Sequence, residues 1–131
     1  MTEIVLLLAM VLNAPAPLVR DVYAEGGLDA VAVVSMESNF NPKAIRREAR
    51  GHTSYGLFQL DDEWHPQHRG DIAAHIREGV KILRECEGTD LRTKVSHYNG
   101  GTYPGAYSEK WGRMVEARRD SLALYLWRHL R

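Results

Sequence analysis

The segment from Leu28 to Ser38 (LDAVAVVSMES) constrains the fold more than any other part of the chain, because almost all of its side chains are apolar. A helix that is apolar on most of its faces has to lie in the middle of a hydrophobic core. The sequence therefore predicts a central helix here. Asn41-Pro42 ends it, because proline disfavours helical geometry in the preceding residue.

Five further helices are predicted from apolar spacing and from residues that start or end helices. They cover residues 4–12, 16–25, 72–86, 90–98 and 108–129, with Asp71 as the N-cap of the third and Gly26-Gly27 after the second. Strand signals are almost absent, and the polar residues 46–54 indicate a loop or a small hairpin. The predicted fold is all-α or α-dominated, in a single domain over residues 1–131, with a loop or small β-hairpin near residues 50–56.

The first of these helices, from Ile4 to Leu12, consists of nine apolar residues. A membrane-spanning helix needs roughly 20 apolar residues, so the sequence predicts no stable membrane span. The core of a signal peptide is an alternative that stays open. Its only flanking charge is Glu3, however, whereas signal peptides carry Lys or Arg there. We expect a buried first helix of the domain.

Charge and cysteine content exclude several classes of protein. The chain has 17 Lys and Arg against 17 Asp and Glu, and a net charge of zero argues against a nucleic acid or an anionic membrane as the main partner. The single cysteine, Cys86, excludes an intrachain disulfide, and Glu85 and Glu87 beside it disfavour a reactive thiolate. His65 and His68 have a metal-like spacing, but no cysteine or HExxH motif supports it, so we expect no metal and no cofactor.

Glu37 is the residue most suited to chemistry, because it follows a run of apolar residues in the central helix. Apolar surroundings destabilise the charged form of a carboxyl group and raise its pKa, so that it stays protonated near neutral pH. A general acid needs this property. The alternative is that Glu37 points to solvent from the helix end or bonds to neighbouring backbone.

Three separated blocks of sequence surround this assignment: residues 37–44 (ESNFNPKA), 55–60 (YGLFQL) and 97–101 (HYNGG). In this order they resemble the lysozyme-like superfamily, and specifically the soluble lytic transglycosylases that cut bacterial peptidoglycan. The first block is similar to the catalytic ES-x-F-N-P-x-A turn of that family. The second and third are similar to its G-L-M-Q and A-Y-N-x-G motifs, with Phe58 in place of Met and His97 in place of Ala.

The resemblance implies a lysozyme-like fold and a lytic transglycosylase that uses Glu37 as its only acid and base. It also extends to animal lysozymes, which have a second carboxylate at the position that Ser54 holds here. Hydrolysis by a muramidase stays open, because Asp61, Asp62 or Glu63 could replace that carboxylate. A non-catalytic glycan-binding or structural protein is a third alternative.

The resemblance and the distribution of aromatic residues suggest a set of substrate-binding side chains. We expect Tyr55, Gln59, Tyr98 and Asn99 from the motifs, Ser54 from its place at the position of the second lysozyme carboxylate, and Trp64, Tyr103 and Tyr107 as aromatic walls of a sugar cleft. Structural roles remain open for Gln59 and Tyr98, and Asn99 is typical of a turn. Trp111 has the spacing of a core residue on the last helix.

The implied partner is the peptidoglycan glycan strand, bound by a monomer. The implied place of action is the bacterial cell wall, in the periplasm. We expect delivery by a phage holin or a virion, because no convincing signal peptide is present; a small enzyme of a secretion system is the alternative.

Overall fold

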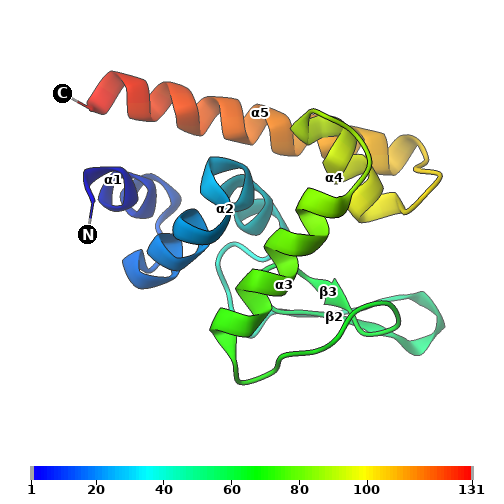
Figure 1. Ribbon diagram of the computed structural model, residues 1–131. Coiled ribbons are helices and arrows are strands. Elements are labelled where there is room, and N and C mark those ends of the chain that lie inside the picture. Colours follow the sequence, from blue (N-terminus) through cyan, green and yellow to red (C-terminus); the bar gives the residue numbers. More distant parts are fainter. Residues whose placement is uncertain (1, 131) are drawn as a thin grey trace.

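Helix α2 (Ala16–Glu37) runs through the middle of the molecule in the computed structural model, which describes residues 2–130 (Figure 1). Its residues 30–35 are all buried, which confirms the predicted central helix. The two helices predicted at 16–25 and 28–38 are joined in this one element, with a kink at Gly27. Gly27 has φ 68° and ψ −161°, a backbone conformation that residues with a side chain rarely adopt.

The other helices lie close to their predicted ranges: α1 (Glu3–Leu12), α3 (Ile72–Glu85), α4 (Leu91–Gly100) and α5 (Ala106–His129). Asp71 and Asp90 cap α3 and α4, since their side chains accept hydrogen bonds from the backbone N–H groups of Ala74 and Thr93. Ile72 has the sequence spacing that predicts a place in the apolar stripe of α3. It is instead exposed, in the first turn of that helix.

The expectation of a buried first helix is only partly right. Val5, Leu8 and Ala9 are buried, but Met10 on the other side of α1 is 73% exposed. Helix α1 is therefore an outer helix with one face in the core. Within residues 2–130, no single helix is long and apolar enough to cross a membrane. Helices α1 and α2 together pass that test by length and composition, but they meet at an angle of 119°.

A small antiparallel sheet of three strands lies next to α3, below α4 in the view of Figure 1. Its strands are β1 (Ile45–Arg47), β2 (Thr53–Tyr55) and β3 (Leu60–Asp61), and a short 3₁₀ turn (Ala49–Gly51) joins the first two. The predicted hairpin is present but starts earlier, and the sequence analysis missed β3. In the observed register, Ser54 of the central strand faces Arg46 on one side and Asp61 on the other.

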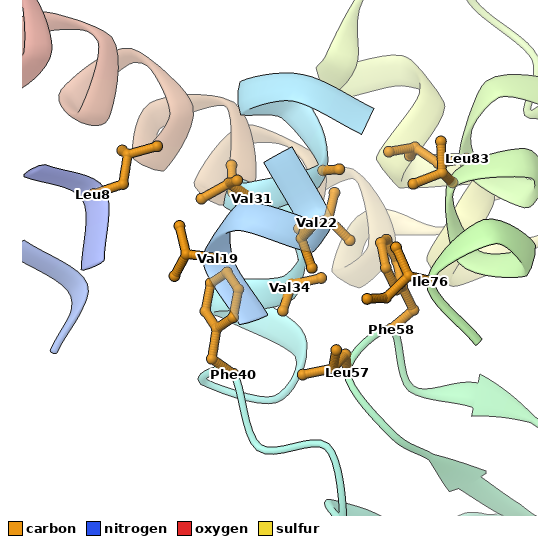
Figure 2. Close-up of a cluster of buried hydrophobic side chains, with 14 of the residues drawn as sticks. Leu8, Val19, Val22, Val31, Val34, Phe40, Leu57, Phe58, Ile76 and Leu83 are labelled. Carbon is orange, nitrogen blue, oxygen red and sulfur yellow. The ribbon is translucent and has the colours of Figure 1, made fainter. Parts of the chain in front are cut away.

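The turn between β2 and β3 anchors the sheet to the helices. Leu57 and Phe58 are fully buried, and they point into the cluster formed by α2 and α3 (Figure 2). Phe58 packs against Gly79 of α3 so closely that a Cβ atom at Gly79 would lie 2.2–2.7 Å from its ring. The absence of a side chain at Gly79 therefore lets α3 and the sheet share one core.

We predict that Gly79→Ala destabilises the protein by about 1–3 kcal/mol, because the added methyl group overlaps the Phe58 ring. Urea unfolding followed by circular dichroism would measure the change. Gly105→Ala is the matched control, since a Cβ atom there meets nothing within 4 Å. Equal stability losses in the two variants would contradict this account of the packing.

Candidate active site

Glu37 is the last residue of α2, and it lines a cavity of about 500 Å³. The side chain is half-buried, and its Oε1 accepts a hydrogen bond of 2.9 Å from Nε1 of Trp111 on α5. The cavity is lined by residues of α2, the sheet region, α4 and α5: Glu37, Arg46, Glu48, His52, Ser54, Gln59, Asp61, Tyr98, Asn99, Tyr107 and Trp111.

The environment of Glu37 raises its pKa from 4.5 to about 7. Loss of water by burial is the largest cause, because it penalises the charged form. The hydrogen bond from Trp111 and the charge of Arg46 oppose this rise, and the charge of Glu48 adds to it. Glu37 is therefore close to half-protonated at neutral pH, in agreement with the expectation from its apolar surroundings.

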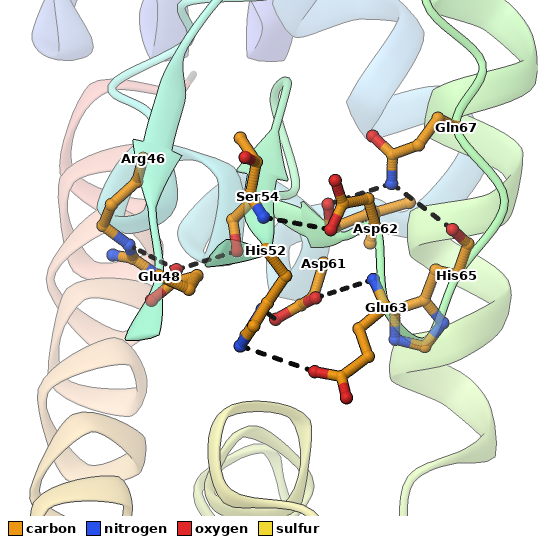
Figure 3. Close-up of polar contacts among 11 residues, drawn as sticks. Arg46, Glu48, His52, Ser54, Asp61, Asp62, Glu63, His65 and Gln67 are labelled. Atoms are coloured by element: carbon orange, nitrogen blue, oxygen red, sulfur yellow. Dashed lines mark hydrogen bonds and ion pairs between the residues drawn. The ribbon is translucent and has the colours of Figure 1, made fainter. Parts of the chain in front are cut away.

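Glu48 is a second carboxylate in the same cavity, and the sequence analysis missed it. Its Oε1 accepts hydrogen bonds of 2.8 Å from Nε of Arg46 and from Oγ of Ser54 (Figure 3). Burial alone would raise the pKa of Glu48, but these two hydrogen bonds and the charges of Arg46 and His52 bring it below its usual value. Near neutral pH an ionised Glu48 and a partly protonated Glu37 thus line the same cavity.

A second cavity, of about 630 Å³, adjoins the first and shares Gln59, Asp61, Tyr98 and Asn99 with it. Trp64 lines this second cavity. The two cavities together form what we call the groove. Of the eight predicted substrate-binding residues, six line the groove: Ser54, Gln59, Trp64, Tyr98, Asn99 and Tyr107.

Gln59 and Tyr98 use their polar groups chiefly to hold the wall of the groove. The amide nitrogen of Gln59 donates to the carbonyl oxygens of Ala44 (3.1 Å) and Gly56 (2.9 Å), which leaves only the amide oxygen for a ligand. The hydroxyl of Tyr98 donates to the carbonyl oxygen of Phe58, and burial raises the pKa of this tyrosine. Both residues thus fix the turn between β2 and β3 in place.

Asn99 also has a structural contact, as its turn-like sequence suggests. Its Oδ1 accepts a hydrogen bond of 2.7 Å from Oγ of Ser108, so it joins the end of α4 to the start of α5. Tyr107, beside that junction, is 71% exposed at the rim of the cavity. The aromatic ring is accordingly open to a ligand that enters the groove.

Two predicted site residues, Tyr55 and Tyr103, lie outside the groove, and Trp111 has a role that its spacing did not predict. Tyr55 lines neither cavity, because neighbouring residues of a strand point to opposite faces and Ser54 takes the groove side. Its ring instead packs edge-on against His75, with Arg69 on its face. Tyr103 is 91% exposed and also outside the groove. Trp111 packs against the core, as expected, but it also lines the groove and donates a hydrogen bond to Glu37.

His75 has a structural role, whereas the sequence showed it only as one of several nearby histidines. Its Nε2 accepts a hydrogen bond of 3.0 Å from the backbone N–H of Phe58. Burial, with a smaller contribution from the charge of His68, lowers the pKa of His75 to about 4. The neutral imidazole is therefore a permanent acceptor near neutral pH, and it holds the turn that carries Gln59.

Comparisons of the chain with protein-family models, curated proteins and solved structures give no match. The likeness to lytic transglycosylases accordingly depends on the three sequence blocks. All three contribute residues to the groove: Glu37 from the first, Gln59 from the second and Tyr98 and Asn99 from the third.

We predict that Trp111→Phe raises the pKa of Glu37 above its value of about 7, by about one unit. Phenylalanine keeps an aromatic ring but lacks the N–H group that stabilises the carboxylate. Carbon-13 NMR titration of the glutamate carboxyl groups would measure the pKa. Trp127→Phe is the control, because Trp127 lies on the same helix and is 80% exposed. An unchanged or lower pKa in Trp111→Phe would be inconsistent with this assignment.

Proposed function

We propose that the protein is a peptidoglycan lytic transglycosylase that cleaves the β-1,4 bond between N-acetylmuramic acid and N-acetylglucosamine. The observation that carries the proposal is the pKa of about 7 for Glu37, at the wall of a groove formed by two adjoining cavities of about 500 and 630 Å³. A group with a pKa near the working pH both donates and accepts a proton efficiently. A transglycosylase uses one side chain first as the acid and then as the base.

The proposed reaction has two steps. Protonated Glu37 first donates its proton to the glycosidic oxygen, while the carbonyl oxygen of the 2-acetamido group attacks the anomeric carbon and the glycosidic bond breaks. Glu37, now a carboxylate, then takes the proton from the 6-hydroxyl of the muramoyl residue. The 6-oxygen attacks the anomeric carbon and displaces the acetamido oxygen, which gives a 1,6-anhydro ring. No water is consumed.

Glu48 supports this reaction by its charge. The sugar carries positive charge as the glycosidic bond breaks, and a fixed carboxylate in a partly buried cavity stabilises that charge. Arg46 and Ser54 hold Glu48 in place and keep it ionised. The same two hydrogen bonds make it a weak base, which favours attack by the acetamido group over activation of water.

A muramidase that hydrolyses the same bond is the second candidate, and the presence of Glu48 favours it. A hydrolase needs a second carboxylate as nucleophile or as base for water, and two carboxyl groups whose pKa values are shifted in opposite directions are typical of such sites. Glu37 and Glu48 have such opposite shifts. In either case the substrate is the glycan strand of the bacterial cell wall.

We predict that the protein releases muropeptides with 1,6-anhydro ends, which are lighter than hydrolysis products by the mass of one water. Mass spectrometry of digested peptidoglycan distinguishes the two. Glu37→Gln should reduce the rate by about 100-fold or more, because the variant cannot donate the proton, while binding of chitooligosaccharides is retained. Glu3→Gln, on α1 away from the groove, is the control. Full activity of Glu37→Gln would eliminate Glu37 as the acid.

We predict that Glu48→Gln lowers the rate roughly 10- to 100-fold and leaves the product a 1,6-anhydro sugar, because Glu48 contributes charge and no bond. Glutamine keeps an oxygen that can accept from Arg46 and Ser54, so the hairpin should persist. Glu85→Gln, exposed on α3, is the control. If the wild type yields reducing ends and Glu48→Gln abolishes them, the muramidase is the correct function.

A further inference from the structure

His52, just before β2, lies between two carboxylates at the wall of the groove (Figure 3). Its Nδ1 is 2.7 Å from Oδ2 of Asp61, and its Nε2 is 3.4 Å from Oε2 of Glu63. The Nδ1 atom is buried, yet among residues 2–130 it has no partner with the geometry of a hydrogen bond. The contact with Asp61 thus has the distance of an ion pair but not the angle of a hydrogen bond.

A nitrogen and a carboxylate oxygen that lie this close without an aligned N–H group can both become ligands of one cation. Ligands at about 2.0–2.2 Å from a shared ion are roughly 3–4 Å apart, so the 2.7 Å between Nδ1 of His52 and Oδ2 of Asp61 would have to widen slightly. One ligand atom from each of His52, Asp61 and Asp62 lies within 4.8 Å of the others. These three side chains can thus reach one ion with small adjustments.

Backbone N–H groups orient both aspartates for this purpose. Oδ1 of Asp61 accepts from the N–H of Glu63 (2.9 Å), and Oδ1 of Asp62 accepts from the N–H of Thr53 (3.0 Å). Each carboxylate therefore keeps its second oxygen for another contact. Partners that fix the orientation of a ligand in this way are usual at metal sites.

We propose that His52, Asp61 and Asp62 bind one divalent transition-metal ion, such as Zn²⁺ or Mn²⁺. An imidazole ligand favours these ions over Ca²⁺ and Mg²⁺, which prefer oxygen ligands alone. Glu63, 45% exposed and beside His52, adds a further negative charge that the cation offsets. The inference does not rest on the proposed function, and it differs from the expectation of no metal drawn from the sequence.

Such an ion would connect the start of β2 with the end of β3. His52 precedes β2, Asp61 ends β3 and Asp62 follows it. His52 and Asp61 also line the cavity that contains Glu37 and Glu48. Metal binding would thus join these two strands at the wall of the groove and offset the negative charge of the aspartates there.

Isothermal titration calorimetry of the chelator-treated full chain with ZnCl₂ and with MnCl₂ tests the proposal. We expect one ion per chain and at least tenfold weaker binding of Ca²⁺ and Mg²⁺. Asp62→Asn and His52→Gln should each weaken binding at least tenfold. Asparagine keeps the oxygen that accepts from Thr53, so this variant should fold, and unchanged far-ultraviolet circular dichroism would verify it.

Two controls separate this site from other binding. The double variant His65→Gln, His68→Gln removes the histidines with metal-like spacing and should leave affinity unchanged, as should Asp120→Asn on the exposed side of α5. Trp64, two residues from Asp62, provides an independent fluorescence signal of binding. The proposal is overturned if no ion binds, if affinity survives both Asp62→Asn and His52→Gln, or if the His65/His68 variant abolishes it.

Discussion

The candidate site depends on the desolvation of Glu37, which raises its pKa and follows from the position of α2. Residues 30–35 of this helix are all buried, so its last residue, Glu37, lies at the boundary between core and groove. Moving a carboxyl group into such surroundings costs free energy unless it is protonated or paired. Trp111 supplies one hydrogen bond, which limits the rise in pKa without cancelling it.

The turn at Leu57 and Phe58 gives this arrangement its rigidity, because three helices hold it. Ser38, after α2, donates to the carbonyl oxygen of Leu57, and Tyr98 of α4 donates to that of Phe58. His75 of α3 accepts from the N–H of Phe58. The sheet that carries Glu48 is thereby fixed relative to the helix that carries Glu37, so the two carboxyl groups keep their unequal protonation in one cavity.

The sequence predicted the helices well, because their apolar spacing and caps are local signals, and it identified Glu37 from the helix around it. It could not show which side of the hairpin faces the groove, and so the assignment of Tyr55 to the site, made from the motif at residues 55–60, was wrong. Glu48 was missed because an acidic residue in a polar loop has no local signature of burial. The one available signal was its position among arginines in residues 46–50. Trp111 has the spacing of a core residue. Its hydrogen bond to Glu37 depends on how α5 packs against α2, which the sequence does not show.

Strand β1 pairs with β2 on one side only, and all three of its residues are exposed. An outer strand offers free backbone groups to which another chain can add, which is a route to aggregation. Arg46 and Arg47 place two positive charges on this strand, and like charges repel a second copy that approaches edge to edge. The arginine that keeps Glu48 ionised thus also helps to protect the open border of the sheet from self-association.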